Sequence, residues 1–295
     1  MADFTVSSFM GSFEAIPQNF LNQVFPALAG AVSTPVYYSA VLYIALYGYS
    51  VYAGYGSFTM KDFLAKAATV IMVFATLNWG GFAGQMYKAA VGIMNGAAGV
   101  IISGQQVNST LDGVWMQMHR IFSNIMATAS WYNIGIILFG FLIYGVTEVL
   151  MVIAVVNMVM AKIYLAIAFS LLPLFVSFAF WPMTRQWFMN CISAILNAIL
   201  IYVITFALLK FGFAYADGYF QQAASASPGE SMQLTLQELI WVVPVFGTLI
   251  LLLLQVKGWA ASLSGAGAVE GVGAIVGAIV GGSTLKGFAN KVRGK

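Results

Sequence analysis

The longest apolar run of the chain, residues 133–181, is broken only by Glu148, Asn157 and Lys162. About 20 helical residues cross a bilayer core, so this run is too long for one crossing. We therefore expect two spans with a tight turn near 157–162. Charged residues make up 7% of the chain and hydrophobic residues 61%, whereas soluble domains carry about 25% charged residues. So few charges cannot cover a soluble surface, and lipid must cover much of it.

Other apolar segments predict the remaining crossings, and the segment 89–104 is short enough either to cross or to re-enter the membrane. The clear segments are 36–57, 67–86, 190–214 and 239–256. Pro182 ends the long run, because proline inside a helix removes a backbone hydrogen bond. The predicted fold class is all-α, a polytopic transmembrane helical bundle of about five to seven spans with an amphipathic N-terminal helix.

Residues 1–35 carry apolar side chains at spacings of three and four, which predicts an amphipathic helix bent at Pro17. The apolar positions are Phe9, Phe13, Ile16, Phe20, Val24 and Leu28. This helix either lies in the membrane interface or against the rest of its own chain, or it forms a docking surface for another subunit. A transmembrane domain follows over 36–257, with a polar central region at 105–130, and residues 258–295 form a Gly/Ala-rich basic tail.

The distribution of cations predicts the orientation, because cytoplasmic loops are rich in Lys and Arg. Lys257 and the terminal cluster place the tail in the cytoplasm; that cluster is Lys286, Lys291, Arg293 and Lys295. The cation-free loop 217–238 is then periplasmic and Arg185 faces the cytoplasm. If the number of crossings is odd, Lys66 also faces the cytoplasm and the N-terminus is periplasmic. The N-terminus lacks a basic region before an apolar one, so we expect no cleaved signal peptide. The single cysteine excludes a disulfide within the chain.

Glu148 is the most unusual residue, because an ionisable group at membrane depth costs about 2.5–3.5 kcal/mol. It is either a coupling or pore-lining carboxylate, or a structural acid that is paired or protonated; Lys162 and Lys210 are candidate partners. With Asn157 and Asn197 it forms a predicted polar path. A polar ladder on one helix face either joins helices or lines a substrate path; its members are Asn190, Ser193 and Asn197.

Glycines at four-residue spacing, Gly273, Gly277 and Gly281, predict close helix packing, with a flexible tail as the alternative. His119 is the only histidine, which excludes two-His metal motifs and makes a Ser–His site poor. No glycine-rich run is followed by the Lys-Ser/Thr of a phosphate-binding loop. We therefore expect no enzymatic activity, no catalytic residues, no metal and no cofactor.

The stretch 161–204 resembles the core of the TrbL-type inner-membrane subunit of bacterial type IV secretion and conjugation systems. The resemblance lies in a span that ends in Leu172–Phe175, in Thr184-Arg185 about ten residues later, and in Phe188 before a long apolar helix. Members often have glycine before the proline, where this chain has Leu172. The architectural residues implied by this motif are Pro173, which would break its helix, Arg185, which would anchor the cytoplasmic end, and Trp187.

The resemblance implies a non-enzymatic, homo-oligomeric channel or assembly subunit of the inner membrane that supports pilus biogenesis and translocation of DNA or protein. Its implied partners are other inner-membrane secretion subunits, the pilin and the minor pilus-tip subunit, besides membrane lipid. The alternative is an independent secondary transporter of a small solute, which predicts inverted repeats with paired broken helices. Pro173 and Pro244 have no matching pair in the first half. A third hypothesis, an intramembrane hydrolase, requires a nucleophile–base pair.

Overall fold

The computed structural model of this chain is helical wherever it describes regular structure. It describes residues 6–55, 59–101, 112–113, 115–116, 119–120, 122–123, 134–225 and 241–265. Within these segments every helix is an α-helix or a short π or 3-10 turn, and no strand occurs. The all-α prediction is therefore confirmed for this part of the chain.

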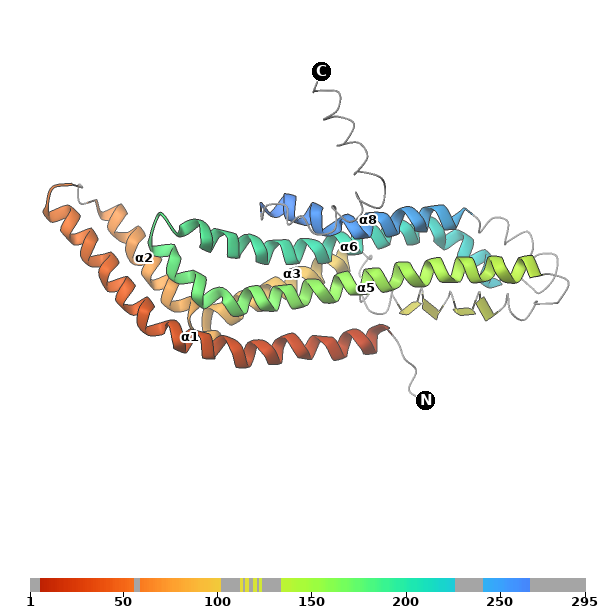
Figure 1. Cartoon of the computed structure of the whole chain (residues 1–295), viewed down its shortest axis with the longest axis horizontal. Coiled ribbons are helices and arrows are strands. Elements are labelled where there is room, and N and C mark those ends of the chain that lie inside the picture. The colour runs from red at the N-terminus through yellow and green to blue at the C-terminus, as the bar shows by residue number, and fades with distance from the viewer. Residues whose placement is uncertain are drawn as a thin grey trace, which may run out of the picture. The chain divides into compact units, whose positions relative to one another are not determined.

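Two groups of residues pack internally, and each is described by itself. The first unit comprises Met1–Ala97 and Val159–Ile199, and the second comprises Ala98–Met158 and Leu200–Lys295. Their described helices are drawn in Figure 1. These units reflect contacts and do not test the predicted domain boundaries, which stay predictions.

Helix α1 (Val6–Tyr52) is one continuous helix that contains Pro17, Pro26 and Pro35. The amphipathic N-terminal segment and the first predicted span therefore belong to a single helix, with no helix end at residue 35. Each proline removes one backbone hydrogen bond, and prolines are tolerated inside membrane helices where neighbouring groups compensate.

The buried face of α1 is not the face expected from the apolar pattern. Its buried side chains recur at helical spacing and include Met10, Leu21, Phe25, Ala29, Val36 and Ala40. Ile16 and Phe20, which belong to the predicted stripe, are instead 55% and 41% exposed. Lipid accepts apolar side chains as readily as a protein interior does, so an apolar stripe does not identify the packed face of a membrane helix.

The predicted span 67–86 is wrong as a continuous helix. Helix α2 (Met60–Thr76) ends early, the π-helical turn η1 (Trp79–Ala83) follows, and α3 (Gly84–Ile101) continues in a new direction. The two straight parts are bent by 81°. This arrangement is a broken span or a re-entrant loop.

The break has a local cause in the sequence Asn-Trp-Gly-Gly. The Asn78 side-chain oxygen accepts a hydrogen bond from the Gly80 amide at 3.1 Å, which caps the new helical turn. Gly81 adopts a non-helical conformation, with φ −104° and ψ −124°. An asparagine cap followed by two glycines therefore ends α2, although the hydropathy of the segment continues.

Helix α5 (Ile134–Val176) is unbroken, so the turn predicted near 157–162 is wrong. The sequence there contains no glycine or proline, and Asn157 and Lys162 both find partners, as described below. At about 1.5 Å per residue, a helix of 43 residues is roughly 65 Å long. That length exceeds the hydrocarbon core of a bilayer, which is about 30 Å thick.

Pro173 does not break α5, which corrects a second prediction. The helix continues for three residues beyond it to Val176 and then tightens into the 3-10 turn η2 (Ser177–Phe180). Pro173 is buried, and other helices pack around this region. The chain reverses only at the turn that contains Pro182, as the sequence predicted.

Helices α6 (Arg185–Ser225) and α8 (Val242–Ser264) confirm the spans predicted at 190–214 and 239–256. Helix α6 extends further than expected, into the first part of the predicted loop 217–238. The remainder of that loop lies outside the described residues.

Close approach of α6 and α8 marks the interior of the second unit, where Figure 1 shows the two helices side by side. The ring centroids of Phe213 and Phe246 lie 6.5 Å apart. A Cβ atom added to Gly212 would lie 2.2 Å from Leu249 Cδ1. Glycine at this position therefore lets the two helices pack closely.

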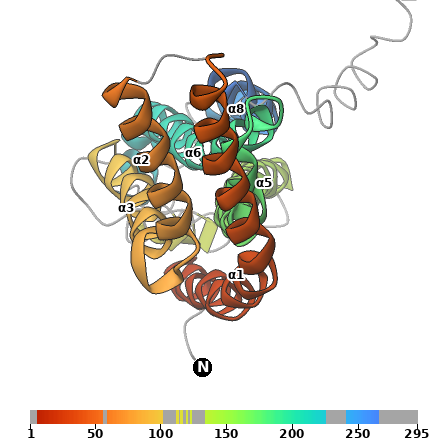
Figure 2. The same ribbon diagram turned by 90° about the vertical axis from the view of Figure 1, so that its left-hand side faces the viewer.

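The core of the first unit lies where α1, α2 and η2 meet. Its buried residues are Val36, Ala40, Val73, Val176 and Phe180. Figure 2 shows α1 and α2 side by side at the front. This packing joins the two stretches of sequence that make up the first unit, and it forms one wall of a cavity.

Four described helices are long and apolar enough to cross a membrane, or five if the bent pair α2–α3 is one span. The upper count reaches the lower end of the predicted range of about five to seven spans. The chain is therefore a polytopic membrane protein.

Candidate functional site

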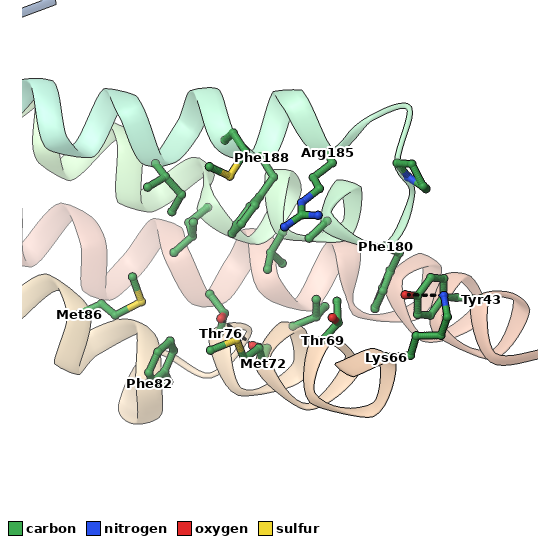
Figure 3. A pocket seen from close by; sticks show the side chains of 17 residues that line it. Tyr43, Lys66, Thr69, Met72, Thr76, Phe82, Met86, Phe180, Arg185 and Phe188 are labelled. Atoms are coloured by element: carbon green, nitrogen blue, oxygen red, sulfur yellow. Dashed lines mark hydrogen bonds between the residues drawn. The ribbon is translucent and has the colours of Figure 1, made fainter. Parts of the chain in front are cut away.

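A cavity of about 720 Å³ lies within the first unit. Side chains from α1, α2, η1, α3, the end of α5 with η2, and the start of α6 line it. Figure 3 shows Lys66 and Arg185 toward one end, with Phe82 and Met86 toward the other. The cavity is therefore cationic at one end and apolar over most of its walls.

Lys66 is held in place by tyrosines of the neighbouring helix α1. Its Nζ atom donates to the Tyr43 hydroxyl at 3.5 Å and lies 4.9 Å from the ring centroids of both Tyr43 and Tyr47. Tyr43 is itself packed against Phe180 and Trp181, at centroid distances of 5.4 and 6.1 Å. Cation–π contact stabilises the ammonium in this partly apolar setting.

Arg185 is the first residue of α6 and projects into the same cavity (Figure 3). The turn before it is fixed by backbone and side-chain hydrogen bonds: the Arg185 amide donates to the Trp181 carbonyl at 2.9 Å, and the Thr184 hydroxyl donates to the Phe178 carbonyl at 3.0 Å. Trp187 packs edge-on against Phe178, with centroids 5.1 Å apart. Of the three predicted architectural residues, only Arg185 lines the cavity.

The described lining of the cavity offers cations, hydroxyl groups and apolar side chains. Among the lining residues that the structure describes, none is His, Cys, Asp or Glu. Across the described parts of the chain, no group of three or more such side chains is placed to hold a metal ion. The Thr69 and Thr76 hydroxyls are engaged by the backbone carbonyls of Ala65 and Met72.

Glu148 lies half-buried in the second unit, next to a short series of hydrogen-bonding groups. The hydroxyl of Tyr144, one turn earlier in α5, donates to the Glu148 carboxylate. The same hydroxyl oxygen lies 3.3 Å from His119 Nε2. His119 Nδ1 lies 3.2 Å from the Trp115 carbonyl oxygen, to which it can only donate. Sequence reasoning treated His119 as isolated and missed this connection.

Lys162, one of the two candidate partners of Glu148, forms an ion pair with Glu14 of α1. The Lys162 side chain is 11% exposed and that of Glu14 is 47% exposed. The pair joins residues 148 positions apart, so no local pattern in the sequence could have indicated it. It fixes α1 against α5 within the first unit.

Asn157 and Asn197 are both buried but have different surroundings. In the second unit the Asn157 amide donates to the Leu253 carbonyl of α8 at 2.9 Å. In the first unit the Asn197 side-chain oxygen has no hydrogen-bond partner among the described residues. Asn157 therefore ties two helices together, whereas Asn197 keeps an unused acceptor. Their assignment to a polar path stays a prediction.

Two other predicted features are only partly described. Within the polar ladder, Asn190 Oδ1 accepts a hydrogen bond from Gln186 at 3.0 Å on an exposed surface. The predicted packing glycines of the tail, Gly273, Gly277 and Gly281, lie outside the described residues. Their role stays a prediction.

The cluster of Lys66 with Tyr43 and Tyr47 was also missed. Its one signal in the sequence is the four-residue spacing of the two tyrosines, which places them on the same helix face. The lysine comes from another helix, so only the tertiary structure reveals the cluster.

Comparison with known proteins gives a consistent result. Residues 40–256 match the family described as "TrbL/VirB6 plasmid conjugal transfer protein". Over 215 residues, the chain is 24% identical to a type IV secretion system protein VirB6 from Bartonella quintana, covering 70% of this chain and 67% of the relative. A VirB6 protein from Bartonella henselae is 23% identical over the same share of both chains.

The matched region extends from the C-terminal part of α1 through most of α8 and includes the cavity, Glu148 and both buried asparagines. Relatives of this kind are membrane components of type IV secretion systems. Together with the apolar helices, the match identifies a multi-pass inner-membrane protein that works with other secretion components. The chain belongs to the TrbL/VirB6 family of plasmid conjugal transfer proteins.

Proposed function

We propose that this chain is a non-enzymatic channel or assembly subunit of a type IV secretion system, which supports pilus biogenesis and substrate translocation. The observation that carries the proposal is the family match over residues 40–256, which covers most of the described helices.

The predicted polar path remains part of this proposal. Asn197 supports it, because a buried oxygen without a partner in the described structure is costly and retained only where something compensates. Glu148 supports it as well, because a carboxylate beside Tyr144 and His119 can exchange hydrogen bonds with a passing polar group. Asn157 contributes its side-chain oxygen, since its amide is engaged by α8.

We also propose that the chain assembles as a homo-oligomer that contacts the other inner-membrane subunits, the pilin and the minor pilus-tip subunit. The N-terminus would be periplasmic and the C-terminus cytoplasmic. Lys66 and Arg185 line one cavity, which supports the expectation that both belong to the same side of the membrane.

The test is a deletion of this chain in cells that carry the complete secretion system. Transfer of substrate and assembly of pili should both be lost and should both return when the chain is supplied again. Normal transfer and normal pili in the deletion strain would contradict the proposal.

Glu148→Gln gives a sharper test of the polar path. The amide can donate to the Tyr144 oxygen and leave that hydroxyl free to donate to His119, so both contacts persist without the charge. If the carboxylate serves transfer, this variant should assemble normally and transfer poorly, as should Glu148→Ala. If Glu148→Ala is degraded while Glu148→Gln transfers normally, the residue is structural.

A further inference from the structure

Lys66 and Arg185 are two cations that line one cavity, and none of the described residues that line it with them is an acid. Neither side chain forms an ion pair with an acidic residue in the described part of the chain. Lys66 is half-buried and Arg185 is exposed, and positive charge from both at this end of the cavity favours the binding of an anion. A bound anion would therefore supply the negative charge that the described lining residues do not provide.

The Lys66 ammonium is held in position before any ligand arrives, and so is the backbone that carries the Arg185 side chain. Lys66 is fixed by Tyr43 and Tyr47, and the backbone of Arg185 is fixed by the hydrogen-bonded turn at Trp181. A guanidinium offers paired donors that match the geometry of a phosphate, and a lysine adds a point charge. Such preorganisation lowers the cost of binding.

The rest of the cavity is apolar and opens toward the surroundings. Met72, Phe82 and Met189 lie on its wall and are 61%, 44% and 45% exposed. Leu172 and Val176 form a buried part of the wall. In a protein whose helices cross a membrane, an exposed apolar rim of this kind meets lipid acyl chains.

We propose that this cavity binds an anionic phospholipid, with its phosphodiester at the end of the cavity that Lys66 and Arg185 line and an acyl chain against the apolar wall (Figure 3). The two cations select negative charge, and the wall selects an apolar chain. A small soluble anion would use the cations alone. A zwitterionic lipid would bring a positively charged ammonium group, and none of the described lining residues is an acid that could pair with it. This site is independent of the secretion role proposed above.

The test uses the full chain in nanodiscs made of equal parts phosphatidylglycerol and phosphatidylcholine, and native mass spectrometry after extraction counts the retained lipids. The wild-type chain should retain phosphatidylglycerol in preference to phosphatidylcholine. Lys66→Gln and Arg185→Gln should each weaken retention about fivefold, since one cation near an anionic headgroup contributes about that factor. Lys88→Gln and Arg120→Gln remove exposed cations outside the cavity and should leave retention unchanged.

Equal retention of both lipids by the wild-type chain would overturn the proposal, and this comparison needs no variant. The same holds if the two control variants weaken retention as much as the cavity variants, since binding would then follow total charge. A third arm adds inorganic phosphate without lipid. Displacement of phosphatidylglycerol by millimolar phosphate would show that the cations bind a soluble anion and that the apolar wall contributes nothing. Unchanged elution on size exclusion confirms that each variant is folded.

Discussion

Glu14→Ala should destabilise the first unit, because it removes the carboxylate that pairs with the Lys162 ammonium. Lys162 lies in the middle of α5, where the neighbouring side chains are apolar. The ion pair offsets part of the cost of desolvating the ammonium, and removal of the carboxylate takes that contribution away.

The expected magnitude follows from the exposure of the two side chains. Removal of one partner from a fully buried pair costs about 3–5 kcal/mol. Glu14 is 47% exposed, so solvent already screens the pair in part. We therefore expect Glu14→Ala to lower the free energy of unfolding by about 2 kcal/mol, roughly half of the buried value.

Lys162→Met separates the effect of the charge from the effect of packing. Methionine retains an unbranched apolar chain and removes the ammonium, so this variant should stay within about 1 kcal/mol of the wild type. In its background, Glu14→Ala should cost almost nothing, which gives a coupling energy of about 2 kcal/mol.

The assay is unfolding of the purified chain by SDS titration, followed by tryptophan fluorescence, for the wild type, both single variants and the double variant. An equal cost of Glu14→Ala in the two backgrounds would refute the reasoning, because the carboxylate would then act through something other than Lys162. A cost below about 0.3 kcal/mol in the wild-type background would also refute it and would place the pair among surface ion pairs of little consequence.

Three further changes test particular contacts. Gly84→Ala places a Cβ atom 2.3 Å from a backbone oxygen and should lower the free energy of unfolding by about 1–3 kcal/mol. The Cβ atom of Gly96→Ala meets open space, so this control should not lower the free energy of unfolding. Equal effects of the two variants would show that the bend tolerates a side chain. Asn157→Leu removes the hydrogen bond to Leu253 and should lower the free energy of unfolding by about 1 kcal/mol in an SDS titration. An unchanged free energy of unfolding would show that this hydrogen bond does not stabilise the fold. Cys191 is 6% exposed and is the single cysteine, so a maleimide should label the chain only after unfolding, and rapid labelling of the folded chain would contradict its buried position.

The helices of this fold could be predicted where the signal is local. Apolar segments at 190–214 and 239–256 became α6 and α8, and the turn at Pro182 lies where proline predicted it. Hydropathy alone failed at Asn78, because a side-chain cap and two glycines ended α2 inside an apolar segment. It failed again at 157–162, because polar residues that suggested a turn were satisfied within the bundle.

The candidate site could be predicted only in part. Arg185 was identified from the motif that resembles the family. Lys66, which lines the same cavity, was not, since the two residues come from different helices. The pairing of Glu14 with Lys162 depends on how α1 lies against α5, which no periodicity encodes. Periodicity in a membrane protein reports which side chains are apolar and not which of them face protein, as the exposed Phe20 shows.

The most direct test of the secretion role is isolation of the tagged chain in mild detergent from cells that express the complete type IV secretion system, with mass spectrometry of the proteins that accompany it. We expect other inner-membrane secretion subunits to be enriched over an unrelated tagged multi-pass protein from the same cells. Recovery of the chain without any secretion subunit above that background would contradict its role as a component of the machine.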